Sequence, residues 1–77
     1  MIVYQFDEER LCREELGSYT AFSICAYEVS GGTRRLLLRI PDVFRSREKA
    51  AAFAARCNAL QLSLIHLPDV MYDALAG

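Results

Sequence analysis

The segment from Ser18 to Val29 constrains the fold of this chain more than any other part of the sequence. It is rich in Tyr, Phe, Thr, Ile and Val and contains neither Gly nor Pro, a composition typical of a β-strand. Apolar residues fall on both of its alternating faces, which predicts a central strand. The glycine pair in Ser30-Gly31-Gly32-Thr33 suits a hairpin turn. A second strand is predicted over Arg34–Ile40, and Pro41 is expected to end it because proline cannot donate to a ladder.

The N-terminal residues predict a further strand in the same sheet. Ile2–Phe6 alternates with aromatic side chains, as a half-buried strand does. Residues 7–16 are open to two interpretations. They form either a short helix, capped by Asp7 and ended by Gly17, or an exposed polar strand. Propensity favours the helix, whereas the family resemblance described below favours the strand.

Two helices are predicted after the sheet. Ser46 is a good N-cap, because its hydroxyl can accept a hydrogen bond from a free N–H of the first turn. The alanine-rich run that follows consists of strong helix formers and is expected to end near Asn58. A second helix is predicted from Pro68, which suits a first turn, to about Leu75. The residues expected to face the core are Ala50, Phe53, Ala54, Cys57 and Leu60 in the first helix, and Val70, Met71, Ala74 and Leu75 in the second.

These elements predict an α+β fold: an antiparallel meander of about three strands followed by two C-terminal helices packed on one sheet face. Residues 1–77 leave room for one domain. A chain of this length buries only about 60% of its unfolded surface, and its apolar share of 53% is above the usual globular range. Part of that apolar surface is therefore expected to be buried against a partner or a second copy.

Cysteine spacing and the N-terminus exclude several protein classes. Cys12, Cys25 and Cys57 are too far apart for a metal or redox motif with a two-residue gap, so no metal and no cofactor is predicted. The first residues have neither the basic start nor the apolar run of a signal peptide. An odd number of cysteines without such a signal indicates reduced thiols in the cytoplasm. No apolar run approaches the roughly 20 residues of a membrane-spanning helix, so no membrane contact is expected.

The stretch SLIHLPDV places Ser63, His66 and Asp69 at even three-residue spacing. A catalytic triad draws its members from separate elements and sets its serine on a sharp turn, and this stretch does neither. The structural interpretation is favoured. His66 or Leu67 is the expected N-cap of the last helix, and Asp69 is expected to accept a hydrogen bond from a free backbone N–H there.

A thiol nucleophile is the other catalytic possibility, with Cys57 paired to His66. Cys57 falls on the apolar stripe of its helix, however, and buried cysteines pack as small, inert hydrophobes. The sequence therefore predicts a protein that is not an enzyme.

Several motifs resemble a family of small bacterial domains of unknown function. They are Tyr19, Phe22 and Ile24; Asp42 and Val43 before Ser46; Cys57 and Asn58; and a closing Leu62, Ser63, Ile65, His66, Leu67, Asp69 and Val70. Ser23 departs from the pattern, since the family usually has glycine there. The resemblance implies a bacterial domain and supports these element boundaries, but it implies no activity.

Charge is distributed unevenly along the chain. Residues 1–33 carry six acidic and two basic residues, whereas residues 34–59 carry seven basic and two acidic residues. The candidate anion or nucleic-acid contacts are Arg34, Arg35, Arg39, Arg45 and Arg47. The alternatives are that these arginines form a solvated sheet face, or that they pair with the glutamates of residues 8–15, in the same chain or in a second copy.

The sheet face that the helices leave uncovered is predicted to carry Tyr19, Cys25, Tyr27 and Leu37. A homodimer that buried this face could set the basic segment of one copy against the acidic segment of the other. We therefore expect a small cytoplasmic interaction or regulatory domain, non-enzymatic and self-associating as a dimer, with an unidentified protein partner. The alternative is an accessory nucleic-acid-binding protein that uses residues 34–49.

Overall fold

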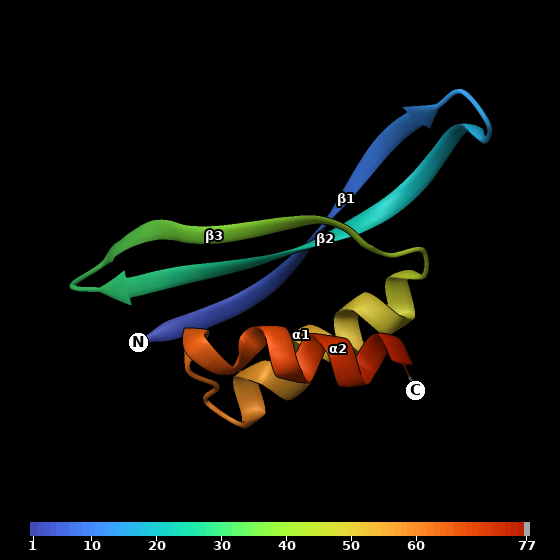
Figure 1. Ribbon diagram of the computed structural model, residues 1–77. Helices are drawn as coiled ribbons and strands as arrows, with labels where there is room; N and C mark the ends of the chain where they lie inside the picture. The colour runs from blue at the N-terminus through green and yellow to red at the C-terminus, as the bar shows by residue number, and fades with distance from the viewer. Residues whose placement is uncertain (77) are drawn as a thin grey trace.

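A computed structural model describes residues 1–76. Its elements are β1 (Ile2–Arg13), β2 (Gly17–Ser30), β3 (Thr33–Phe44), α1 (Arg47–Ala59), the 3-10 helix η1 (Leu64–His66) and α2 (Leu67–Ala76). The strands form one antiparallel sheet of order β1-β2-β3, and both helices lie on the same side of it (Figure 1). The predicted α+β meander with two C-terminal helices is confirmed. Within the described residues, no helix is long and apolar enough to span a membrane.

The strand interpretation of residues 7–16 is largely correct, because β1 continues without interruption to Arg13 and a turn follows. Every residue of β1 pairs with β2, from Ile2 opposite Glu28 to Arg13 opposite Gly17. This continuous ladder outweighs the helix propensity of the segment. Because β3 reaches only as far as Phe22, residues 9–21 form a two-stranded ribbon, which we call the arm. The arm projects away from the helices, and the β2–β3 turn lies at the opposite end of the sheet (Figure 1). The longest dimension of the molecule is 43 Å.

The prediction that Pro41 ends its strand is wrong, since β3 runs on to Phe44. Edge strands and bulges tolerate proline. Pro41 lies in the edge strand β3 and within a bulge of that strand. Residues 41–43 of β3 oppose the single β2 residue Ser23, so the strand bulges here. Within the bulge, Asp42 has a φ of 53°. Aspartate is among the few non-glycine residues that adopt this left-handed conformation readily.

The core lies between the sheet and the helices. Ser46 caps α1 as predicted, since its hydroxyl accepts a hydrogen bond from the Lys49 N–H at 3.3 Å. The core residues are Tyr4, Phe22, Ile24, Ala26, Phe44, Ala50, Phe53, Cys57, Leu67 and Met71. Leu60 and Leu75 were expected to face the core, but both are 55% exposed or more. Leu60 is the C-cap of α1, where the chain leaves the helix and its apolar stripe ends.

Candidate functional site

The predicted catalytic combinations do not come together. Ser63 and His66 lie at the start and end of the 3-10 turn, where the His66 backbone N–H donates to the Ser63 carbonyl at 3.0 Å. In residues 1–76 no hydrogen bond joins the side chains of Ser63, His66 and Asp69. Cys57 is fully buried while His66 is exposed, and burial raises the pKa of the Cys57 thiol. That thiol is therefore protonated at neutral pH and closed to substrate.

The predicted cap of the last helix also differs in detail. The turn η1 runs directly into α2, so His66 belongs to a helical turn rather than to an extended N-cap. Asp69 does lie in the first turn of α2, where its charge suits the helix dipole. Within the described chain, however, its carboxylate accepts no backbone hydrogen bond. A capping box requires a non-helical residue before the first turn of the helix, and the 3-10 turn η1 stands there instead.

The open face, meaning the sheet face opposite the helices, carries a polar network. Its centre is Asp42 in the β3 bulge, whose carboxylate accepts hydrogen bonds from the Tyr19 hydroxyl at 2.9 Å and from Arg13 at 3.0 Å. Arg45 lies 3.4 Å from the same carboxylate. The Asp42 backbone N–H donates to the Glu9 carboxylate at 2.7 Å. Side chains of the arm thus hold the bulge from one side.

Small residues on β2 allow this network to span the sheet. Ala21, Ser23 and Cys25 occupy the open face of the central strand, yet each is at most 1% exposed. Long side chains from the two edge strands meet above them: Arg39 of β3 binds Glu9 of β1 at 2.5 Å. The central strand is therefore covered by its own neighbours rather than by a third layer.

Four of the five predicted anion-binding arginines have partners within the chain. Arg39 pairs with Glu9, and its pKa is raised by that carboxylate. Arg47 pairs with Glu8 at 2.8 Å, and Arg45 pairs with Asp42. The fourth arginine with a partner is Arg34, whose guanidinium donates a hydrogen bond to the Gln5 side-chain oxygen and stacks on the Tyr27 ring.

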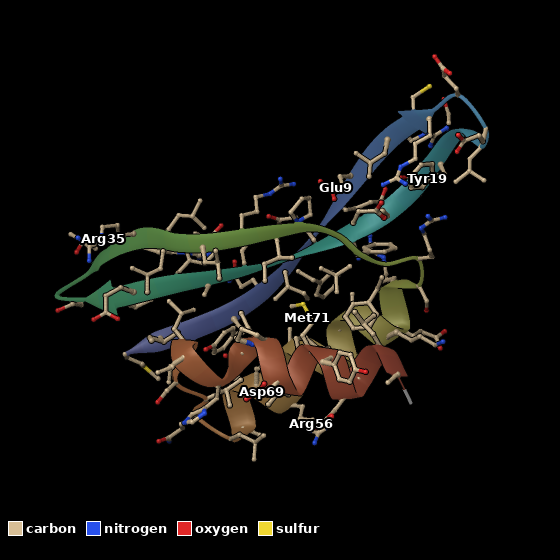
Figure 2. All side chains as sticks on the ribbon, in the orientation of Figure 1. Glu9, Tyr19, Arg35, Arg56, Asp69 and Met71 are labelled. Atoms are coloured by element: carbon tan, nitrogen blue, oxygen red, sulfur yellow. The ribbon has the colours of Figure 1, made fainter. Side chains whose placement is uncertain are left out.

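The distance from the Arg34 guanidinium to the Tyr27 ring centroid is 4.0 Å. Arg35 forms no ion pair within the described residues and lies at the far end of the β2–β3 hairpin, away from Glu9 and Tyr19 (Figure 2). Arg39 and Arg47 thus pair with glutamates of residues 8–15 in the same chain, whereas Arg45 and Arg34 have other partners.

The predicted self-association face is not a bare apolar surface. Cys25 is buried, and its thiol donates to the Asp7 carboxylate at 3.4 Å; burial, followed by this contact, raises its pKa. Tyr19 and Tyr27 lie beneath arginines. A bulge in β3 leaves Leu37 without a partner in the register and sets Leu36 opposite Tyr27 instead.

Sequence reasoning missed a hydrogen-bonded latch between β1 and the end of α1. The Asn58 side chain accepts from the Tyr4 N–H at 2.8 Å and donates to the Tyr4 carbonyl at 2.9 Å. The buried Tyr4 hydroxyl donates to the Leu62 carbonyl at 2.9 Å. The Cys57-Asn58 pair was noted as part of the family resemblance, but its local pattern gives no sign of a partner so distant in the chain.

A groove between the two helices was also not predicted. It has a volume of about 290 Å³ and is lined by Phe44, Lys49, Ala52, Phe53, Arg56 and Ala74. Its floor is apolar, and its two cations lie seven residues apart on α1, which places them on one side of that helix. Among residues 1–76, neither Lys49 nor Arg56 forms an ion pair.

Comparison with known proteins adds no assignment: no family model, no curated protein and no solved structure matches this chain. The resemblance to small bacterial domains therefore stays a prediction. In the described part of the chain, no group of three or more His, Cys, Asp or Glu side chains is arranged to hold a metal ion.

Proposed function

We propose that this chain is a small, non-enzymatic interaction or regulatory domain that acts in the cytoplasm and associates with itself. The observation that carries the proposal is the composition of the α2 region. Its inner residues Leu67 and Met71 are buried, yet Ile65, Tyr72 and Leu75 on its outside are 80%, 73% and 55% exposed. Asp69 and Asp73 are also exposed on α2, but large apolar side chains gathered beside them on a surface are of the kind that a partner normally covers.

Self-association covers such a surface without a further protein. A second copy is always present at the concentration of the first, and closed symmetric dimers are the commonest oligomers. The catalytic alternatives have less support, because the Cys57 thiol is buried and, in residues 1–76, no hydrogen bond joins the side chains of Ser63, His66 and Asp69. The three free cysteines fit a reducing compartment.

Native mass spectrometry of protein purified without nuclease treatment tests the proposal. We expect a dimer mass with no additional component at micromolar concentration. Tyr72→Lys is expected to weaken the dimer, because it places a charge on the outer side of α2. Leu36→Lys, at a residue 50% exposed on β3, is the matched control and is expected to leave the dimer intact. A wild-type chain that stays monomeric up to about 100 µM, well above usual dimer affinities, contradicts the proposal.

Accessory nucleic-acid binding is the weaker candidate. Arg34, Arg39, Arg45 and Arg47 all have partners within the chain, so a phosphate must compete with those contacts. Binding through phosphates weakens steeply with added salt. Nucleic acid that co-purifies with the protein and is released between 50 and 300 mM salt, a range in which such contacts lose orders of magnitude in affinity, would reverse the ranking of the two functions.

A further inference from the structure

We propose that the tip of the arm of one copy docks in the α1–α2 groove of a second copy. The inference rests on the proposed self-association and names its interface. The tip is the turn between β1 and β2, and its residues are Glu14, Glu15 and Leu16. All three are exposed, and the Leu16 side chain is 55% exposed.

The chemistry of the tip complements that of the groove. The tip presents one apolar side chain beside two carboxylates, and neither carboxylate forms an ion pair within residues 1–76. The groove presents an apolar floor that includes Phe44 and Phe53, beside two cations without ion-pair partners in the same residues. If Leu16 packs on the apolar floor, Glu14 and Glu15 lie beside the two cations, so the apolar contact and the ion pairs form together. The charged side chains around Asp42 and Glu9 on the open face already have partners within the chain.

The shape of the molecule requires a second copy for this contact. The arm points away from the helical layer (Figure 1), so a tip does not reach the groove of its own chain. Residues 9–13 alone extend about 17 Å at the rise of a β-strand. A two-fold axis that sets two arms side by side in opposite directions brings each tip to the body of the other copy, and the two contacts are then identical.

An isolated two-stranded ribbon is marginally stable in water. The arm has the Asp42 network on its open face but no helix on its other face (Figure 1). Docking of its tip gives the projecting arm an anchor that the single chain lacks. The groove also includes Ala74 of α2, so the docked tip contacts both helices of the second copy.

Paired charge reversals test the interface. A tip variant carries Glu14→Lys and Glu15→Lys, and a groove variant carries Lys49→Glu and Arg56→Glu. All four side chains are exposed, so both variants are expected to fold, which circular dichroism checks. Each variant alone sets like charges against each other at both contacts. We expect the dimer Kd of each to rise at least about tenfold at low salt.

Mixing the two variants provides the decisive measurement. In a mixed dimer both contacts again join opposite charges, so native mass spectrometry is expected to show mainly the mixed species and little of either homodimer. The control is a second pair of variants, one with Arg35→Glu and the other with Glu48→Lys. Both residues are exposed and neither lines the groove, so each variant is expected to dimerise like the wild type and the two are expected to mix randomly.

The outcomes separate the two proposals. If the wild type is a dimer but the reversed variants dimerise equally well, or mix without preference, this interface is wrong while self-association stands. If the wild type is monomeric, both proposals fail.

Discussion

The side-chain amide of Asn58 forms two hydrogen bonds with the backbone of Tyr4, one to its N–H and one to its carbonyl. Because β1 is an edge strand, the amide takes the place that the next strand of a sheet would occupy. It blocks the outer edge at this residue, and edge strands with free backbone groups invite pairing with other chains. The same contact fastens the end of α1 to the sheet.

Replacing Asn58 by alanine is expected to lower the free energy of unfolding by about 1–3 kcal/mol, because both backbone groups of a strand that is otherwise packed lose their partner. Urea denaturation monitored by tyrosine fluorescence measures this change. Asn58→Asp is the matched variant: it keeps an acceptor for the Tyr4 N–H but sets a carboxylate oxygen against the Tyr4 carbonyl, so a loss at least as large as that of Asn58→Ala is expected at neutral pH. Equal stability of all three proteins would show that the latch contributes nothing.

Asp42 is expected to be sensitive to substitution for two separate reasons. Its φ of 53° disfavours alanine by about 1 kcal/mol, and its carboxylate binds Tyr19 and Arg13. Asp42→Ala is therefore expected to lower the melting temperature more than Asp42→Asn, which tolerates the backbone conformation. Asp42→Gly separates the causes, because it relieves the backbone and removes only the carboxylate. A melting temperature unchanged by Asp42→Ala contradicts this account.

The three thiols are expected to react at very different rates. Cys12 is exposed on the arm, whereas Cys25 and Cys57 are buried. At pH 8 a chromogenic disulfide reagent should modify one thiol per native chain rapidly and the other two only in denaturant. Cys12→Ser should abolish the rapid phase. A rapid phase that persists in this variant would mean that a buried thiol is accessible.

Stability is expected to fall at alkaline pH. Burial raises the pKa of the Cys57 thiol above its ordinary value of 9.0, and burial of Tyr4, together with Cys57, raises the pKa of that phenol above 10.0. The unfolded chain therefore loses these protons at lower pH than the folded chain does. The contribution is fully present below about pH 9, and it is lost as pH rises toward the folded-state pKa values.

Unfolding free energies measured from pH 7 to pH 10.5 by urea denaturation test this sign. Tyr4→Phe removes one of the groups and is expected to flatten the decline above pH 10, although it also loses the hydrogen bond to Leu62. A stability that is constant or rises across this range contradicts the burial of these groups as the cause.

Local pattern in the sequence was sufficient to predict the central strand, the glycine turn and the cap at Ser46. Each depends on the conformational preference of a few adjacent residues: alternating β-formers, glycines with positive φ, and a hydroxyl beside free N–H groups. The α+β class follows from the order of these elements. No local preference of this kind predicts whether two copies associate or which surfaces they use, so both proposals depend on the experiments described above.

Tertiary structure decided the rest. Residues 7–13 are a strand because β2 supplies a continuous ladder to them, and β3 passes Pro41 because Glu9 and Arg13 of β1 and Tyr19 of β2 hold the bulge at Asp42. Arg39 pairs with Glu9 because the meander sets the two edge strands on either side of small residues of β2. Arg47 pairs with Glu8 because α1 packs against β1. Contacts between residues far apart in the chain depend on the strand register. A shift of one residue would move every side chain of a strand to the opposite face of the sheet. The sequence alone therefore determined the class of most elements and their order, and the fold decided how far the strands extend and which side chains meet.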